Sequence, residues 1–361
     1  MENNVTPLVS IVNVTWNGRS LLEKHLPSLA GLHYSNFEVI IVDNGSTDGS
    51  VEFVREHYPR FKIVANEINL GTAEGSNVAI PVARGKYIFW VSNDMEFDPD
   101  IVDHLVARCE SDPRIGICTV KMRRIKDEQL VDEIDSVGAD LDIFGFPASR
   151  GIDEEDRGQL DYSTNVCFSF GGAMMIRKDV LEITGGYDPS FLTLADDIDL
   201  SWRVWLAGYR VVVEPKAFLY HRVSATLGKT HNRAQKRFIS ERNTLRTLLK
   251  NYSTGVLFFI LPVYFLLLIM EMTFFLAVGR PQIAVSGIRA IRWNLDRLKE
   301  TLLLRKEVQS FRKIGDAKIL SMRKKFPEKF RIFLDYLKYR NTPRWKGYMG
   351  TGIGAQSLKN G

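Results

Sequence analysis

Short apolar runs alternate with amphipathic stretches over the first hundred residues of the chain. Four runs rich in β-branched and aromatic residues have the length of strands, at 8–16, 37–44, 62–67 and 86–94. Between them, apolar residues recur at helical spacing over 18–32, 46–58 and 71–85. Alternation of this kind predicts an α/β fold with a mostly parallel, Rossmann-like sheet and right-handed crossovers.

Polar side chains stand where these apolar runs end. Thr15 closes the first run, Asp43 the second, and Asp94 the fourth. The carboxyl ends of parallel strands share one edge of a sheet, and ligands bind at that edge. We therefore expect Asp43 and Asp94 to face one crevice, where two anionic groups call for a cation or hydrogen-bond donors. The alternative for Asp43 is a turn, with Ser46 or Thr47 capping the next helix.

The stretch from 115 to 250 is less regular. A strand pattern over 166–180 is interrupted by Gly171 and Gly172, and residues 185–215 read as turn, helix and strand. The start of that helix carries three carboxylates within four positions, at Asp196, Asp197 and Asp199. A capping box of Thr193 and Asp196 is the alternative explanation, but one cap does not require three carboxylates.

An apolar run over 255–279 has the length of a membrane-spanning helix, which needs about 20 residues. Pro262 would kink a helix over this run, and Glu271 would be costly in the middle of a membrane. Basic residues flank the run on both sides. Because basic flanks favour the cytoplasmic side, both ends should stay there. The pattern favours a re-entrant or in-plane helical hairpin over a single crossing, with a buried core helix as the alternative.

Charge is unevenly distributed along the 361 residues. From 280 onward there are 20 Lys and Arg against 6 Asp and Glu, whereas the whole chain carries a net charge of only +5. The basic, amphipathic tail predicts contact with an anionic membrane surface rather than with nucleic acid. The three cysteines have no metal-site spacing and indicate reduced core thiols in a cytosolic setting, and the first residues lack the features of a signal peptide.

Five segments carry a family resemblance. "VSIVNVTWNG", "VDNGSTDGS", "NLGTAEGSN", "VSND" and "ADDIDLSWRVWLAGYRVVVEPKAFLYH" occur in this order. In order and spacing they resemble the inverting family 2 glycosyltransferases over 8–250, and the tail resembles the rhamnosyltransferase-like subset. The resemblance implies a GT-A fold with a nucleotide-sugar-binding half (1–115) and an acceptor-binding, catalytic half (116–250). Residues 251–361 would form an apolar hairpin and basic amphipathic membrane-associated helices.

The resemblance also implies a donor site. Asp43 would accept hydrogen bonds from the nucleobase, with Thr15 lining the same pocket. The other nucleotide-binding positions would be Asn44, Asn69, Gly71, Asn77 and Asn93. Free N–H groups at the helix start through Gly71 could point at phosphate, although an ordinary glycine-rich helix start explains the pattern equally well.

The metal site departs from the family pattern, since Ser92 replaces the first aspartate of a DxD-like motif. Asp94 then remains as a ligand for Mg²⁺ or Mn²⁺, and His221 stands where the family often supplies another. Such ions use one or two carboxylates plus phosphate oxygens and water, and would neutralise the leaving diphosphate. A purely structural His221 is the alternative.

On the acceptor side, the resemblance makes Asp197 the catalytic base, with Asp196 in place of the family's Glu. Asp196, Asp199, Gly171 and Gly172 would bind the acceptor, and crowding by like charges would raise the proton affinity of Asp197.

The sequence therefore predicts an inverting glycosyltransferase at the cytoplasmic face of a cell membrane. A nucleotide-diphosphate sugar would donate to a glycan or lipid-linked acceptor in cell-surface polysaccharide or glycoconjugate synthesis. The resemblance suggests dTDP-rhamnose, while UDP- and GDP-sugars stay open. Two alternatives are a catalytically silent nucleotide-sugar or glycan-binding scaffold and a nucleotidyltransferase. The latter would be expected to show a basic, glycine-rich loop after the first strand, where "TWNGRS" has one glycine.

Overall fold

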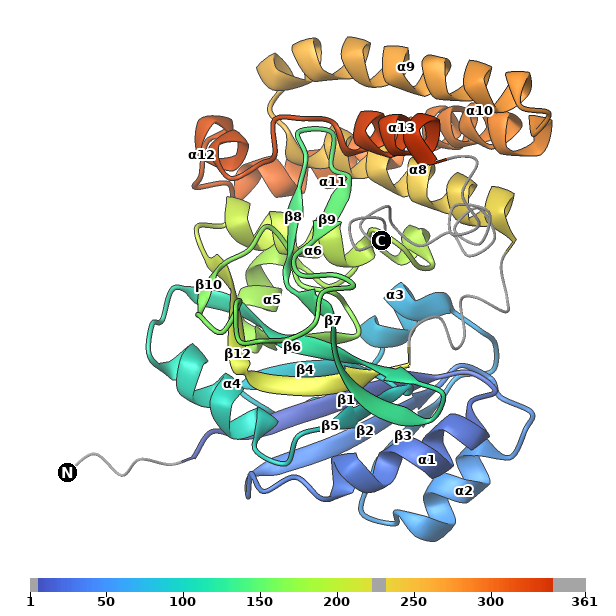
Figure 1. Cartoon of the computed structure of the whole chain (residues 1–361). Coiled ribbons are helices and arrows are strands. Elements are labelled where there is room, and N and C mark those ends of the chain that lie inside the picture. The colour runs from blue at the N-terminus through green and yellow to red at the C-terminus, as the bar shows by residue number, and fades with distance from the viewer. Residues whose placement is uncertain (1–5, 223–231, 340–361) are drawn as a thin grey trace.

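A mixed, ten-stranded sheet lies at the centre of the computed structural model, which describes residues 6–222 and 232–339 (Figure 1). The main path of the sheet runs β10-β12-β6-β11-β4-β1-β2-β3, with β5 paired to β12 and β7 to β6. The strands are β1 (Val9–Thr15), β2 (Phe37–Asp43), β3 (Lys62–Ala65), β4 (Tyr87–Ser92), β5 (Met95–Phe97), β6 (Ile115–Lys126), β7 (Gln129–Val137), β10 (Thr164–Asn165), β11 (Ala173–Arg177) and β12 (Arg210–His221). A separate pair is formed by β8 (Ala139–Leu141) and β9 (Pro147–Ser149).

Parallel pairing brings the predicted strand ends level with one another. β1 pairs in parallel with both β2 and β4, so that Thr15 lies opposite Asp43 and Val14 opposite Ser92. β11 runs antiparallel between β4 and β6, and β6 and β12 are parallel to each other. The prediction of a mostly parallel sheet is confirmed, and its carboxyl edge is the one that carries the predicted donor residues.

Helices cover both faces of the sheet. On one face α1 (Arg19–Ala30), α2 (Ser50–His57) and α4 (Ile101–Glu110) pack on side chains such as Ile11 and Phe89. On the other face α3 (Gly71–Asn77), α5 (Lys178–Thr184) and α6 (Asp196–Leu206) pack on Val12 and Trp90. The predicted helix over 71–85 is shorter than expected, since α3 ends at Asn77 well before Pro81.

A layer of helices follows the α/β body and lies at the top of Figure 1. It comprises α8 (Arg233–Asn251), α9 (Thr254–Ala277), α10 (Pro281–Asp296), α11 (Leu298–Ser310), α12 (Asp316–Ser321) and α13 (Glu328–Tyr339). The apolar run forms one helix, α9, which includes Pro262. The chain then turns at Gly279, which has a φ of 72°, into α10, and the two helices pack together. The hairpin thus pairs the apolar helix with the basic helix that follows it.

The outer side of α9 is apolar and exposed. Leu257, Ile260 and Leu268 are buried against the rest of the layer, whereas the side chains of Phe258 and Phe259 are 75% and 73% exposed. Among the described residues, α9 is the one helix long and apolar enough to cross a membrane, and only 17% of its most apolar window is buried. The alternative of a buried core helix is therefore wrong. Glu271 is accounted for by ion pairs with Arg237 and Lys329.

Candidate functional site

Asp43 ends β2 with one carboxylate oxygen engaged and one free. Its Oδ2 accepts a hydrogen bond from the Ser46 N–H at 2.9 Å, so the predicted turn role is real. Its Oδ1 is buried, and no hydrogen-bond partner for it exists among the residues that the structure describes. The predicted cap by Ser46 or Thr47 is wrong, because α2 begins at Ser50 with Gly49 before it. Because a buried carboxylate oxygen without a donor is costly, Oδ1 fits a donor group supplied by a ligand.

Thr15 and Asn93 continue the same edge beside Asp43. Thr15 is the register partner of Asp43 on β1, and its Oγ1 accepts a hydrogen bond from Asn93 Nδ2 at 2.9 Å. A side chain at Gly18 would collide with this pair, since a Cβ there would lie 2.5 Å from Asn93 Nδ2. The structure therefore brings Asp43, Thr15 and Asn93 together, as the sequence predicted.

Two of the predicted nucleotide-binding asparagines instead hold the framework together. Asn44 donates to the Gly71 carbonyl at 2.9 Å and accepts from Asn66 Nδ2 at 2.9 Å. Asn77 donates to the Tyr187 carbonyl and accepts from the Tyr187 N–H, at 2.9 and 2.8 Å. Because both amides are engaged inside the protein, we assign Asn44 and Asn77 to positioning α3 and not to ligand contact.

The helix start at Gly71 is also used internally. Asn69 Oδ1 accepts from the Gly71 N–H at 2.8 Å, and the Leu192 carbonyl accepts from the Thr72 and Ala73 N–H groups. Gly71 has a φ of 78°, and a Cβ there would lie 2.7 Å from the Leu192 oxygen. The predicted phosphate contact of these N–H groups is therefore corrected: Asn69 fixes the start of α3, the Thr72 and Ala73 N–H groups bind the Leu192 carbonyl, and Gly71 leaves space for the Leu192 loop.

Asp94, His221 and Asp135 form a line at the end of β4. Asp94 Oδ1 is buried without a hydrogen-bond partner in the described part of the chain, and it faces His221 Nε2 at 3.7 Å. His221 Nδ1 contacts Asp135 Oδ2 at 2.9 Å. Burial lowers the pKa of His221, but the neighbouring carboxylates of Asp135 and Asp94 outweigh burial and raise that pKa to about 10.

Once a divalent ion displaces the proton of His221, this line fits a metal site with few protein ligands. A carboxylate that orients the far nitrogen of a metal-binding histidine is a common outer partner, and Asp135 has that place. Within the ranges described, no group of three or more His, Cys, Asp and Glu side chains could enclose a metal ion, so water and phosphate oxygens would have to complete the ligand set. Sequence reasoning missed Asp135, which lies 86 residues before His221 in the chain.

Asp197 reaches the same edge through the glycine pair. Its Oδ2 accepts from the Gly171 N–H at 3.0 Å. The Gly172 carbonyl in turn accepts from the Ser92 N–H at 2.9 Å, and a Cβ at Gly172 would lie 2.5 Å from Ser92 Oγ. The two glycines thus allow α6 to approach the end of β4 closely. The carboxyl edge of the sheet therefore carries a row of polar side chains, from Asp43, Thr15, Asn93 and Asp94 to Asp197.

The acidic start of α6 has an environment that suits a base. Burial, and then the charge of Asp197, raise the pKa of Asp196 to about 7. Burial likewise raises the pKa of Asp197 to about 6. A base with a pKa near the working pH is the most effective in general acid–base catalysis. The capping-box alternative is wrong, because α6 begins after Ala195 and its fully described N-terminus has no side-chain cap.

Asp199 does not belong to the site. It is fully buried, and its Oδ2 accepts from Arg203 Nε at 3.0 Å and from Lys250 Nζ at 2.9 Å. Its Oδ1 accepts from Asn251 Nδ2 at 3.2 Å. The prediction that Asp199 binds the acceptor is therefore wrong, because permanent partners occupy both of its oxygens.

A strained loop delivers Asp196 and Asp197 to the site. Leu192, Leu194 and Ala195 all have positive φ values, of 61°, 65° and 62°. Asn243 of α8 holds this loop, since its Nδ2 lies within hydrogen-bond distance of the Phe191, Thr193 and Leu194 carbonyl oxygens. Strain of this kind persists only where the surroundings impose it, and it is common next to active sites. No sequence pattern pointed to Asn243.

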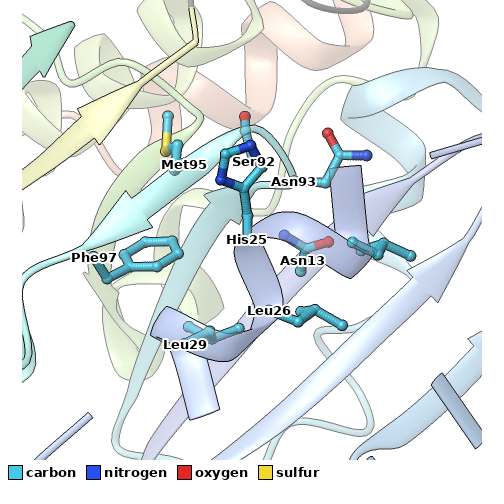
Figure 2. A pocket seen from close by; sticks show the side chains of 9 residues that line it. Asn13, His25, Leu26, Leu29, Ser92, Asn93, Met95 and Phe97 are labelled. Carbon is cyan, nitrogen blue, oxygen red and sulfur yellow. The ribbon is translucent and has the colours of Figure 1, made fainter. Parts of the chain in front are cut away.

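A small gap lies beneath the site, between α1 and the end of β4. His25 and Asn13 line it together with Ser92 and Asn93, and Figure 2 shows the His25 ring directed toward Ser92. The gap leaves no room for a water molecule. Burial, and then the charge of Arg222, lower the pKa of His25 to about 4, so this ring is neutral. We conclude that the gap supports the site from below and holds no substrate.

The free cysteines agree with the sequence. Cys109, Cys118 and Cys167 are all buried and unpaired thiols. Burial raises the pKa of Cys167, which makes it a poor nucleophile.

Comparison with known proteins gives consistent matches. "Glycosyl transferase family 2" matches residues 10–184, and "Glycosyl transferase family group 2" matches 153–286. The chain is 25% identical over 222 residues to a poly-beta-1,6-N-acetyl-D-glucosamine synthase of Staphylococcus epidermidis, which covers 61% of this chain and 51% of that protein. It is 28% identical over 228 residues to the O-antigen biosynthesis protein RfbC of Myxococcus xanthus, over 61% of this chain and 18% of that protein.

The chain therefore spans about half the length, or less, of these curated relatives. Among solved structures, the crystal structure of GalNAc-T7 with UDP, GalNAc and Mn²⁺ has a TM-score of 0.56 and 17% identity, over 69% of this chain and 48% of that one. This likeness supports the fold, a GT-A-like sheet with flanking helices.

Proposed function

We propose that this chain, which family 2 glycosyltransferase models match over 10–184 and 153–286, is an inverting glycosyltransferase that uses a nucleotide-diphosphate sugar. One observation carries the proposal. The side chains of Asp43, Asp94 and Asp197 lie along one sheet edge, and none of them is paired with a lysine or arginine among the described residues. Asp43 and Asp94 each keep a buried oxygen without a hydrogen-bond partner in the described residues, and such oxygens suit a ligand that brings its own donors and cation, whereas Asp197 is held by the Gly171 and Ile198 N–H groups.

In the proposed reaction, Asp43 and Thr15 hold the nucleobase, and the Asp197 carboxylate takes the proton of the acceptor hydroxyl. The hydroxyl oxygen forms a bond to the anomeric carbon while the bond from that carbon to the diphosphate oxygen breaks. The electron pair of the broken bond leaves with the nucleoside diphosphate. Since the attack comes from the face opposite the leaving group, the configuration inverts and no covalent enzyme intermediate is needed.

Asp94 and His221 would hold a Mg²⁺ or Mn²⁺ ion, with Asp135 fixing the ring of His221. When bound, such an ion neutralises charge on the leaving diphosphate. The Mn²⁺ and UDP named with the structural neighbour GalNAc-T7 support this proposal. Residues 1–115 would form the donor half and residues 116–250 the acceptor half.

The acceptor would be a glycan or lipid-linked glycan of cell-surface polysaccharide synthesis, as the names of the two bacterial relatives suggest. The donor is a dTDP-, UDP- or GDP-linked sugar, with dTDP-rhamnose suggested by the motif pattern. The exposed apolar side of α9 supports attachment to a membrane, with α9 in the membrane plane. The basic residues on both sides of this run are the reason to propose the cytoplasmic face.

The test is the Asp197→Asn variant, assayed against a panel of sugar nucleotides with Mn²⁺. We expect transfer to fall by about 10²–10⁴-fold, the usual contribution of a general base. Nucleotide affinity, measured by calorimetry, should stay unchanged, because Asp43 and Thr15 are untouched. Undiminished transfer in the variant would remove the proposed base. Failure of the unaltered protein to turn over any donor would favour a binding scaffold instead.

A further inference from the structure

Two arginine-bearing helix faces meet between α8 and α10. On α8, Phe238, Arg242 and Arg246 recur every four residues, and on α10 Arg289 and Trp293 continue to Arg297 in the same way. The Arg242 guanidinium lies 4.7 Å from the Trp293 ring and 5.1 Å from the Phe238 ring. Arg297 lies 4.6 Å from Trp293, and Arg289 lies 5.0 Å from Phe238. Aromatic faces thus hold three guanidinium groups in one cluster.

This cluster lacks counter-charge. Arg246 is neutralised, because it pairs with Asp188 at 2.8 Å and also with Glu300. Across residues 6–222 and 232–339, no carboxylate forms an ion pair with Arg242, Arg289 or Arg297. Arg242 is only 6% exposed, and burial, with the charges of Arg297 and Arg246, lowers its pKa to about 10. A buried cation among cations is costly unless an anion joins it.

The cluster lies between the catalytic loop and an apolar surface. Arg242 donates to the Ser190 carbonyl at 3.2 Å, in the segment that leads to Asp196 and Asp197. On α10, Ile288 directly precedes Arg289, and Leu295 lies between Trp293 and Arg297 in the sequence. Both side chains are exposed. α10 packs on α9, so these exposed apolar side chains and those of α9 stand on neighbouring helices. A ligand at the cluster would therefore have an apolar surface on one side and the acceptor half on the other.

We propose that Arg242, Arg289 and Arg297 bind the phosphate group of a lipid-linked acceptor. This inference rests on the proposed function and names its acceptor class. Guanidinium groups present forked donors that match phosphate oxygens, and they are more weakly hydrated than lysine ammonium groups. The lipid would lie along the apolar surface of α9 and α10, and the glycan would extend toward Asp197. The donor diphosphate would be neutralised separately, by the divalent ion that Asp94 and His221 would hold.

The test uses the full chain and farnesyl diphosphate as the probe, with farnesol as the uncharged counterpart. The Arg289→Gln/Arg297→Gln double variant leaves the buried Arg242 in place, so the fold is retained. Arg292→Gln is the matched control, because Arg292 is on the same helix but pairs with Asp296 at 3.9 Å. Calorimetry should show a dissociation constant for farnesyl diphosphate that is at least about tenfold larger in the double variant and unchanged in Arg292→Gln. A tenfold change is the least that the loss of hydrogen bonds between charged groups should cause.

Two further measurements separate the outcomes. Binding to phosphatidylcholine vesicles with and without phosphatidylglycerol tests whether the arginines contact headgroups of the bulk membrane. Loss of phosphatidylglycerol-dependent binding together with unchanged affinity for farnesyl diphosphate would overturn the proposal, as would equal affinities in all three proteins. Donor hydrolysis with Mn²⁺ should persist in the double variant. Suppose that donor hydrolysis persists in the double variant and is lost in Asp197→Asn, and that the affinity for farnesyl diphosphate is the same in every variant. The proposed phosphate site is then wrong, and the glycosyltransferase proposal stands.

Discussion

The buried carboxylate of Asp196 should destabilise the protein at neutral pH. Asp196 is 8% exposed and lies beside Asp197, and burial together with that neighbour raises its pKa from 3.8 to about 7. The folded state therefore binds a proton that the unfolded chain has already released. Asp196→Asn keeps the shape of the side chain and removes the charge. We expect this variant to be more stable than the natural protein.

The sign and size of the effect follow from proton linkage. A folded pKa above the unfolded value gives a penalty that is absent below about pH 4, grows as the pH rises, and is complete above about pH 7. For a shift from 3.8 to about 7, the penalty is about 4 kcal/mol at pH 8 and about 2 kcal/mol at pH 5. These are upper limits, because Asp196 and Asp197 titrate as a pair. The gain in stability from Asp196→Asn should thus fall by about 2 kcal/mol between pH 8 and pH 5.

Urea unfolding at both pH values measures this gain. Glu56→Gln is the control, since Glu56 is an exposed carboxylate on α2, and its effect should stay within about 0.5 kcal/mol at either pH. An equal gain at pH 8 and pH 5, or a loss of stability at pH 8, would refute the reasoning. A loss at pH 8 would mean that Asp196 is ionised without penalty in the folded protein, and an equal gain would mean that the gain does not come from its titration.

Two further predictions concern the metal site and the membrane surface. Asp135→Asn should raise the Mn²⁺ concentration needed for half-maximal donor turnover by about 10–100-fold, because His221 loses its orienting carboxylate, whereas Asp132→Asn on the same strand should have no effect. An unchanged Mn²⁺ requirement in Asp135→Asn would contradict the assigned role. Phe258→Ser/Phe259→Ser should leave the free energy of unfolding nearly unchanged and reduce sedimentation with phosphatidylglycerol vesicles at least tenfold, since each ring is mostly exposed in the absence of a bilayer. Leu130→Ser, an exposed apolar change on β7, is its control, and equal sedimentation of both variants would argue against α9 as the membrane contact.

The fold could be predicted because its signals are local. β1, β2 and β4 are mostly apolar, as expected for strands buried on both faces, and each ends at or is followed by polar residues. Parallel pairing then placed Thr15 opposite Asp43 without further information. The same logic placed Asp94 and Asn93 at this edge. Residues that end strands are the ones that sequence alone can assign to a site.

The partners of each polar side chain could not be predicted in this way. Asp199 and Asp197 stand two positions apart on one helix, yet Asp199 meets Lys250 and Asp197 meets the Gly171 N–H. Lys250 is 51 residues away in the chain, and its position depends on how α8 packs on α6. Asn69 is similar, because the Leu192 loop that occupies the neighbouring N–H groups comes from far along the sequence. Long-range packing decides which polar group stays open to a ligand.

The placement of fixed cations separates the carboxylates of the framework from those of the site. Asp188 and Asp199 are buried deeply and share Lys250, and Asp188 also meets Arg246. Removing one partner from such a pair leaves an uncompensated charge, so these pairs tie α8 to the start of α6. Asp43 and Asp94 are also buried, but each keeps an oxygen without a hydrogen-bond partner in the described residues. Lysine and arginine surround Asp188 and Asp199, whereas the free oxygens of Asp43 and Asp94 lower the stability of the protein. A bound donor with its cation would offset that loss of stability.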